Sequence, residues 1–218
     1  MGNIKILLDN GHGIDTPGKR SPDESLREYK YTREIAERIA SELKRMGYDA
    51  ERIVTEDKDI SLQERCRRIN EVCGKLGKSN VILVSVHVNA AGNGDWKTAG
   101  GWCCYTSPGQ TKADQLATCL YKAAEFSLKD YIDGFKDNKK NGYYDKYQKP
   151  IRTDFSDCDP DYEANFYILK HTQCPAVLTE SLFQDNKKDC EFLLSEEGRK
   201  AIVSLHVKGI VNYINTYC

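Results

Sequence analysis

Short apolar runs alternate with amphipathic segments along most of the chain. The apolar runs at 4–9, 50–55, 80–88, 100–107 and 175–183 each have the length of a buried strand. Between them, apolar residues recur every three or four positions, as they do on one face of a helix. This alternation predicts an α/β fold, with a twisted, mixed and mostly parallel sheet flanked by helices on both faces.

Local signals mark where the helices begin and end. Helical segments are expected at 26–49, 61–77, 112–128 and 195–214. One face of the first carries Tyr31, Ile35, Ile39, Leu43 and Met46. The apolar face of the second carries Leu62, Cys66, Ile69, Cys73 and Leu76. Ser61 and Glu64 form a capping box at the start of the second helix, and Gly47 and Gly77 are the expected C-terminal stops.

The stretch from about Lys129 to Glu163 does not follow this alternation. It is polar, rich in turn-forming residues and studded with tyrosine and lysine. We predict a long polar loop, 129–163, inserted into a single domain spanning 1–218, because loops of this length are usually binding elements. A linker is the alternative, although core patterns return after it. Its tyrosines and lysines could face a polar polymer or simply be solvated.

Composition narrows the possible partners. The 218 residues suffice for one domain with a substantial core. The 32 basic and 33 acidic side chains leave a formal net charge of −1, which argues against nucleic acid and anionic membrane surfaces as partners. No apolar run has the length of a transmembrane helix. The N-terminus enters a strand at once, so we expect synthesis in the cytoplasm without a signal peptide.

The nine cysteines include no CxxC pair. Several of them, such as Cys66, Cys73 and Cys119, occupy apolar positions of helical patterns, where a free thiol behaves as a small hydrophobic side chain. We therefore predict reduced packing residues rather than a disulfide framework, a thiolate metal site or a redox centre.

Three apolar runs lead into ionisable side chains. The first is followed by His12, the third carries His87 near its end, and the last carries Glu180. The carboxyl ends of parallel strands lie along one edge of a sheet, where open α/β folds bind ligands. A lone histidine at a strand end is usually a satisfied core residue, but two histidines and a glutamate at one edge indicate a shared site.

Two imidazoles and a carboxylate suit a zinc site with two histidine ligands, one glutamate ligand and a fourth position for water. Glu28 is the preferred third ligand, because it stands at the start of the first helix, after the loop that follows His12. Glu24 and Asp23 lie further upstream in that loop and are its competitors. Taken alone, Glu28 would be a favourable acid at a helix N-terminus.

The same residues carry a resemblance to a known family. The motifs are "LLDNGHG", "LREYKYTREIA", "SLQERCRRINE", "VSVHVNA" and "PAVLTESLFQDNKKDCEFL". Their order and spacing, from Lys5 to Ile214, resemble the zinc-dependent N-acetylmuramoyl-L-alanine amidases of the type 3 (LytC-like) family. The resemblance implies that His12, Glu28 and His87 hold one Zn²⁺ and that Glu180 is the catalytic glutamate. It implies an amidase catalytic domain that hydrolyses the amide between N-acetylmuramic acid and the L-alanine of the peptidoglycan stem peptide.

Two positions depart from the family pattern. Ile14 replaces the second of two glycines that often follow the first histidine. Leu182 stands where a glycine usually follows the catalytic glutamate by two residues. We therefore expect Leu182 to alter the backbone and the width of the cleft beside Glu180.

Further polar and aromatic residues are candidates for substrate contacts. The candidates are Asn89, Trp102 and Arg152. Trp102 could stack on a sugar or peptide, or pack in the interior. Arg152 could pair with a stem-peptide carboxylate. His206 lies four residues after Ile202 and is assigned to helix packing.

The resemblance implies a peptidoglycan hydrolase, either a phage or prophage endolysin or a bacterial autolysin. It would act on the glycan and stem peptide of the cell wall after release or export, and we expect a monomer. One alternative is a zinc carboxypeptidase acting within the stem peptide, since it would use the same chemistry. The other is an inactive cell-wall-binding module, which the presence of all four candidate residues argues against.

Overall fold

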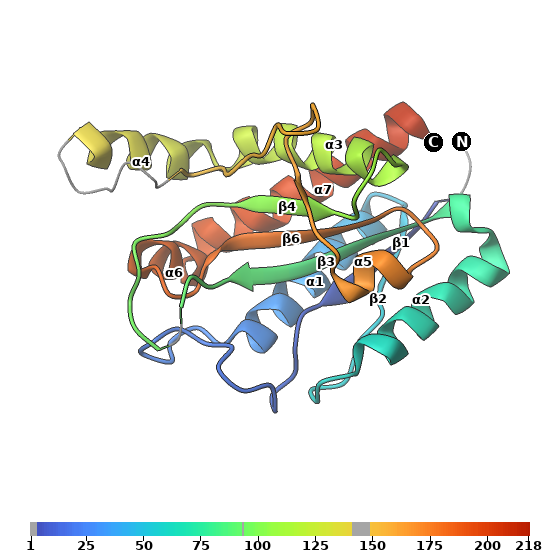
Figure 1. Cartoon of the computed structure of the whole chain (residues 1–218), viewed down its shortest axis with the longest axis horizontal. Coiled ribbons are helices and arrows are strands. Elements are labelled where there is room, and N and C mark those ends of the chain that lie inside the picture. Colours follow the sequence, from blue (N-terminus) through green and yellow to red (C-terminus); the bar gives the residue numbers. More distant parts are fainter. Residues whose placement is uncertain (1–3, 93, 141–148) are drawn as a thin grey trace.

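A single mixed sheet organises the molecule (Figure 1). The computed structural model describes residues 4–92, 94–140 and 149–218. The strands are β1 (Lys5–Asn10), β2 (Asp49–Arg52), β3 (Val81–Asn89), β4 (Cys103–Thr106), β5 (Tyr162–Glu163) and β6 (Ala176–Phe183), in the order β2-β1-β3-β6-β4-β5. β1, β2, β3 and β6 are parallel, whereas β4 is antiparallel to β6 and parallel to β5. The predicted fold class is confirmed.

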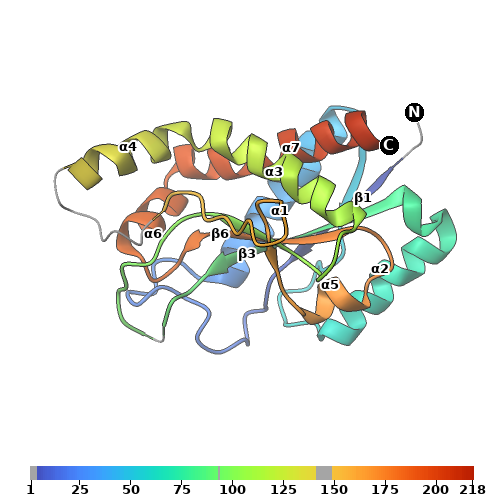
Figure 2. The same cartoon turned by 45° about the horizontal axis from the view of Figure 1, so that its top comes forward.

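Helices cover both faces of the sheet (Figure 2). They are α1 (Glu28–Arg45), α2 (Leu62–Leu76), α3 (Lys112–Ser127), α4 (Lys129–Lys140), α5 (Tyr167–His171), α6 (Lys187–Leu194) and α7 (Glu196–Tyr217), with a 3-10 helix at Lys78–Asn80. Ile6 and Leu8 of β1 pack with α1, α3 and α7, whereas Leu7 packs with α2 and α5. The alternation of side chains along a strand thus builds two hydrophobic layers.

Most positions of the predicted helix faces are buried. Ser61 caps α2 by accepting a hydrogen bond from the Glu64 backbone N–H, which is one half of the predicted capping box. The Glu64 side chain pairs with Arg67 and Arg68 instead. Three positions assigned to apolar faces are exposed, namely Met46, Leu62 and Leu76. They lie just beyond α1 and at the two ends of α2, where the helix no longer covers the sheet.

The segment 129–163 is not the continuous loop expected from its composition. Its first part forms α4, directly after α3, and Tyr162–Glu163 form the short edge strand β5. Charged and polar residues dominate α4, and a glycine, Gly134, lies inside it, so its composition resembled that of a loop. Residues 141–148 of the predicted loop lie outside the described residues.

The cysteines are free thiols, and all except Cys158 and Cys218 are buried. This agrees with their assignment as packing residues. In the part of the chain that the structure describes, no helix is both long and apolar enough to cross a bilayer.

Candidate metal centre

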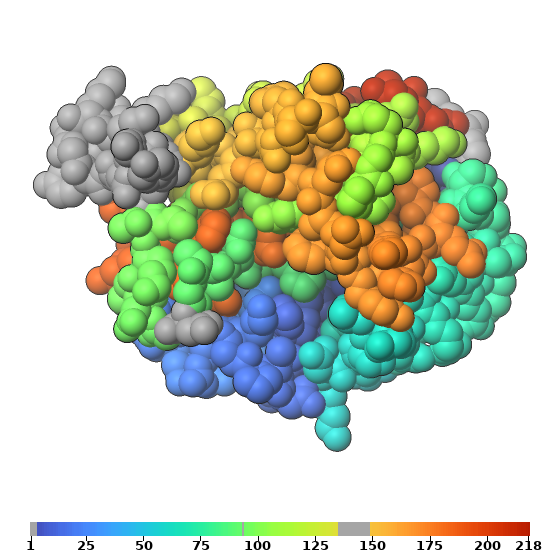
Figure 3. All heavy atoms as spheres, viewed as in Figure 1, coloured from blue at the N-terminus to red at the C-terminus, as the bar shows by residue number. Residues whose placement is uncertain are grey.

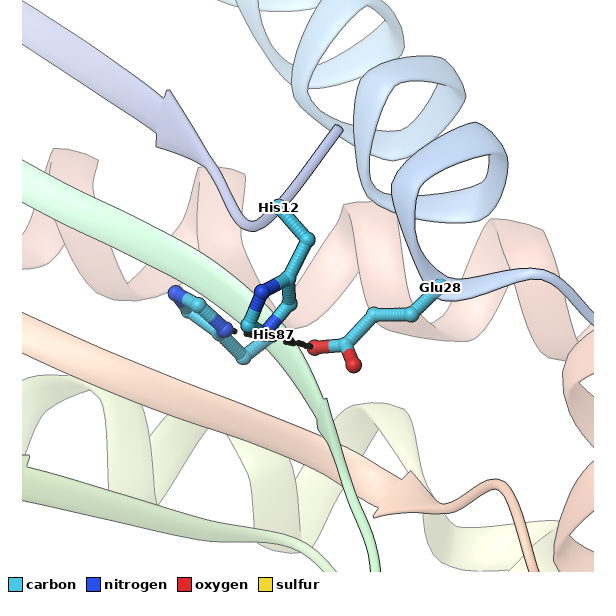
Figure 4. A group of neighbouring side chains, drawn as sticks. All are labelled: His12, Glu28 and His87. Carbon is cyan, nitrogen blue, oxygen red and sulfur yellow. Dashed lines mark hydrogen bonds and ion pairs between the residues drawn. The ribbon is translucent and has the colours of Figure 1, made fainter. Parts of the chain in front are cut away.

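Three side chains from separate segments point toward one another (Figure 4). His12 follows β1, Glu28 begins α1 and His87 is in β3. One nitrogen or oxygen from each lies within 4.8 Å of those of the other two. Glu28 Oε1 is 3.2 Å from His87 Nδ1 and 3.5 Å from His12 Nε2. The two imidazole rings are perpendicular, with centroids 5.2 Å apart. These are the three residues that the sequence predicted to share a site.

Glu28 is held rigidly although it begins a helix. Its side chain is only 1% exposed, and Oε1 accepts a hydrogen bond from the Val88 backbone N–H at 3.0 Å. The carboxylate is thereby tied to β3 beside His87. The two competitors lie elsewhere: Glu24 is exposed and pairs with Arg27, and Asp23 is exposed and accepts hydrogen bonds from Ser21 and Ser25.

His12 adopts an unusual backbone conformation, with φ at 62°. A residue with a Cβ atom rarely occupies this left-handed region, so the surroundings must hold it there. Its carbonyl oxygen accepts hydrogen bonds from Arg33 at 3.0 Å and from Arg65 at 3.3 Å. These two guanidinium groups fix the turn that directs the imidazole toward Glu28.

Gly11 allows this turn to approach β3. A Cβ atom at this position would lie 2.4 Å from the His87 ring, closer than two such atoms can come. Only glycine therefore fits between the strand and the imidazole.

A buried ionic network lies beneath the His12 turn. Arg65 is 2% exposed and donates to Asp9 Oδ1 at 2.5 Å and to the Asn10 carbonyl at 2.7 Å. The Ser85 hydroxyl donates to the other Asp9 oxygen at 2.6 Å. Sequence reasoning missed this network, because Arg65 looks like an ordinary charged residue of an amphipathic helix. The available signal was the position of Arg65 four residues before Ile69, on the buried face of α2.

Glu180 lies beside His87 on the neighbouring strand. The two are register partners in the parallel pairing of β3 with β6. Glu180 was expected at a strand end, but it is the fifth of the eight residues of β6. It reaches the site because register partners on neighbouring parallel strands point their side chains to the same face of the sheet. The Oε2 atom is buried and has no hydrogen-bond partner within the described ranges.

The charges in the site depend on burial and on mutual contact. Burial lowers the pKa of His12 to about 4. Burial also opposes protonation of His87, but the hydrogen bond and charge of Glu28 outweigh it and raise the pKa of His87. The same contact lowers the pKa of Glu28 despite its burial. Burial, aided by the nearby charge of Glu28, raises the pKa of Glu180 to about 8.

The donor set suits a metal ion. Two imidazoles and a carboxylate are the ligands of many catalytic zinc sites. Glu28 Oε1 faces both imidazoles, at 3.2 Å from His87 Nδ1 and 3.5 Å from His12 Nε2. A cation between His12, Glu28 and His87 would take this oxygen and one nitrogen of each ring as ligands. The residues present therefore fit a metal ion.

A pocket of about 430 Å³ opens beside these side chains. It is lined by His12, His87 and Glu180, and further by Asp9, Gly11, Lys19, Asp59, Ile60, Ser61, Leu62, Arg65, Phe166, Tyr167, Ile168 and Leu178. Figure 3 shows a hollow where the blue N-terminal segment, the teal region of α2 and the orange region of α5 meet. Lys19, Phe166 and Tyr167 were not predicted as pocket residues, because no local pattern marks them.

The three residues expected to contact a substrate do not line this pocket. Trp102 is fully buried and packs edge-on against Tyr121. Of its two predicted roles, it therefore has that of packing in the interior. A fully buried indole cannot stack on a substrate. Arg152 lies over the Phe183 ring at 5.5 Å, and Asn89 is half-buried at the end of β3.

Leu182 adopts the conformation that a glycine would adopt easily. Its φ is 62°, and its side chain is fully buried. The backbone two residues after Glu180 thus takes the left-handed form with leucine in place. Ile14, the other departure from the expected pattern, is 55% exposed and occupies no part of the pocket lining.

Comparisons with known proteins agree on one family. A family model described as "N-acetylmuramoyl-L-alanine amidase" matches residues 6–212. An endolysin of Bacillus phage SPP1 is 26% identical over 212 residues, which cover 96% of this chain and 66% of the endolysin. The amidase AmiC of Neisseria meningitidis is 26% identical over 97% of this chain and 53% of its own length. The chain thus spans about two thirds and about half of these two relatives.

Solved structures show the same fold. An N-acetylmuramoyl-L-alanine amidase from Clostridium difficile 630 superposes with a TM-score of 0.75 at 21% identity, covering 100% of both chains. The catalytic domain of CwlV from Bacillus (Paenibacillus) polymyxa superposes with a TM-score of 0.71 at 19% identity, covering 97% of this chain and 98% of CwlV.

Proposed function

The chain belongs to the N-acetylmuramoyl-L-alanine amidase family, and we propose that it hydrolyses the amide joining N-acetylmuramic acid to the L-alanine of the peptidoglycan stem peptide. In this proposal His12, Glu28 and His87 hold one Zn²⁺, and Glu180 is the catalytic group. Support comes from the meeting of these three potential ligands beside Glu180 and an open pocket.

The chemistry must overcome the low reactivity of an amide. When bound, zinc lowers the pKa of water to about 7 and polarises a carbonyl group as a Lewis acid. Glu180 accepts the proton of the attacking water and delivers it to the departing alanine nitrogen. Burial raises the pKa of Glu180, so its carboxylate is a stronger base toward the proton of water, and the acid that results can donate this proton to the nitrogen.

The residues around Glu28 supply orientation. Val88 N–H donates to Glu28 Oε1, the same oxygen that lies 3.2 Å from His87 Nδ1 and 3.5 Å from His12 Nε2, so this contact fixes the carboxylate oxygen that would hold the metal ion. Arg33 and Arg65 hold the carbonyl of His12 and so fix the direction of its imidazole. Such supporting contacts reduce the motion of metal ligands and strengthen metal binding.

The pocket accounts for the substrate class that we propose. Its walls combine the aromatic side chains of Phe166 and Tyr167 with the charges of Lys19 and Asp59. Apolar and charged groups together suit a stem peptide that carries both. Asn89 and Arg152 stay proposed substrate contacts, although neither lines the pocket. We propose an endolysin or autolysin role at the cell wall, in line with the similarity to a phage endolysin.

Mass spectrometry of digested peptidoglycan tests this function. The zinc-loaded protein is expected to release intact stem peptides beginning with L-alanine and glycan chains with free muramic acid lactyl groups. The control is Glu180→Gln, which should release neither. Products shortened only within the stem peptide would instead establish a carboxypeptidase, and binding of sacculi without any product would establish an inactive wall-binding module.

A further inference from the structure

A second group of acidic side chains lies apart from the candidate metal centre. Asp157, Asp159 and Asp161 alternate along the segment that precedes β5, and Asp114 lies in the first turn of α3. One carboxylate oxygen from each of Asp114, Asp159 and Asp161 lies within 4.8 Å of the other two. Figure 3 shows this orange segment at the surface beside the yellow-green start of α3.

Asp161 is the residue that points to a ligand. Its side chain is 1% exposed, and its Oδ2 atom accepts a hydrogen bond from the Thr106 hydroxyl at 2.6 Å. Its Oδ1 atom is buried without a hydrogen-bond partner among the described residues. An ionisable oxygen in this position is strongly unfavourable unless something compensates it.

The compensation does not come from a basic side chain. Across residues 4–92, 94–140 and 149–218, no lysine or arginine forms an ion pair with Asp114, Asp159 or Asp161. The Gln110 amide, which is neutral, is the side-chain donor to Asp159, at 3.2 Å. Burial and the neighbouring carboxylates raise the pKa of Asp161 well above its usual range, the Asp159 contact contributing most after burial.

We propose that Asp114, Asp159 and Asp161 bind a hard divalent cation, Ca²⁺, at a site separate from the zinc centre. All three offer oxygen, which hard cations prefer, and no imidazole or thiol joins them to favour zinc. Ca²⁺ accepts six to eight oxygen ligands in flexible geometry, so the Thr106 hydroxyl and water can complete the set. The Asp161 Oδ1 atom then gains its partner.

The cation would attach the segment before β5 to the body of the fold. Asp159 and Asp161 come from this segment, whereas Asp114 comes from α3. A few residues after Asp161 the chain reaches Phe166 and Tyr167, which line the pocket beside His12 and Glu180. Ca²⁺ thus stabilises one wall of the pocket without touching the reacting atoms.

Calcium binding to the full, zinc-loaded chain tests this proposal. At a Ca²⁺ concentration about 100-fold above Kd, we expect the Tm to rise by about 5–10 °C. Titration calorimetry should give one Ca²⁺ per chain. Asp159→Asn and Asp161→Asn should abolish both signals. The matched control is Asp130→Asn, an exposed aspartate on α4, which should respond to Ca²⁺ as the unmodified protein does.

The same variants distinguish a bound cation from a proton that the carboxyl groups of Asp159 and Asp161 share. Without Ca²⁺, Asp159→Asn removes one of the crowded negative charges and should raise the Tm. With Ca²⁺, the order should reverse, because the unmodified protein gains the cation and the variant does not. If Asp161→Asn fails to fold, Asp159→Asn carries the test, since Asp159 is only half-buried. A Tm that does not respond to Ca²⁺, or that responds equally in Asp159→Asn, overturns the proposal and leaves a shared proton as the explanation.

Discussion

The guanidinium of Arg65 donates a hydrogen bond to the carbonyl oxygen of His12, over 3.3 Å, from within a buried ionic network. The same group donates to Asp9, to the Asn10 carbonyl and to the Ile60 carbonyl. One side chain of α2 therefore fixes the turn that carries a proposed metal ligand. The arrangement couples the stability of the fold to the geometry of the site.

Arg65→Lys should lower both the stability of the fold and the affinity of the site for zinc. Lysine keeps the charge opposite Asp9, but it cannot reach all the acceptors of the planar guanidinium. We expect the free energy of unfolding to fall by about 3 kcal/mol, since buried acceptors lose their donors. Zinc affinity should fall about 10–100-fold, because the imidazole of His12 is no longer oriented. Urea unfolding and competition with a zinc chelator measure the two effects. Arg67→Lys, at an exposed site on the same helix, should change neither, and a folded Arg65→Lys protein with unaltered zinc affinity would contradict the account.

Glu180→Gln should separate catalysis from metal binding. The amide has nearly the shape of the carboxyl group but cannot accept the proton of water, so we expect turnover to fall by at least about 100-fold. Zinc content should remain at one per chain, because Glu180 is not a proposed ligand. In contrast, His87→Ala should lose zinc. Elemental analysis and a turbidity assay on purified cell walls give the two readouts. Appreciable turnover by Glu180→Gln would exclude the residue from the proton transfers.

At Leu182, the glycine variant should be more stable than the alanine variant, which is the reverse of the usual order. Both replacements remove a fully buried side chain, at a cost of about 2–5 kcal/mol. However, the φ of 62° costs a residue with a Cβ atom about 1–2 kcal/mol, and glycine avoids this cost. Leu182→Gly should therefore be more stable than Leu182→Ala by about 1 kcal/mol in urea unfolding. At Leu116, a buried position inside α3, the usual order should hold, with alanine more stable than glycine. The same order at both sites would show that Leu182 is not strained.

His206 should make the protein sensitive to acid. Its Nδ1 atom lies 2.7 Å from the Ile202 carbonyl, which only accepts hydrogen bonds, so Nδ1 carries the proton. Its Nε2 atom then accepts from the Thr179 hydroxyl at 2.8 Å. The buried ring is neutral, and burial lowers its pKa to about 4.

The sign of the pH effect follows from this lowered pKa. Between pH 6.5 and 4 the unfolded chain takes up a proton at His206 and the folded chain does not, so stability falls as the pH falls. The loss should approach about 3 kcal/mol at pH 4. Urea unfolding across this range should show a shallower loss for His206→Gln than for the unmodified protein. His171→Gln, at an exposed histidine, should leave the slope unchanged; equal slopes for His206→Gln would contradict the assignment.

The strands and long helices could be predicted because their signals are local. Hydrophobic alternation, the Ser61 cap and Gly77 lie within a few residues of the elements they define. The meeting of His12 and His87 could be anticipated because parallel strands bring their carboxyl ends to one edge. Each of these inferences needs only the period of a pattern and the direction of the chain.

Other features depend on contacts that no short segment contains. Arg65 becomes structural only because Asp9 and the His12 turn meet it in space. Trp102 is hidden because α3 places Tyr121 against it, and a tryptophan in a sequence reads equally well as a binding surface. The helix α4 is rich in charged residues and contains Gly134, so its composition resembled that of a polar loop.

Gly11 limits how this protein can evolve. Because a Cβ atom there would lie 2.4 Å from the His87 ring, any other residue should displace this proposed metal ligand. A saturation library selected for amidase activity should therefore recover glycine alone at this position. Changes in substrate specificity would then have to come from other residues of the pocket lining, while Gly11 beside His87 stays unchanged.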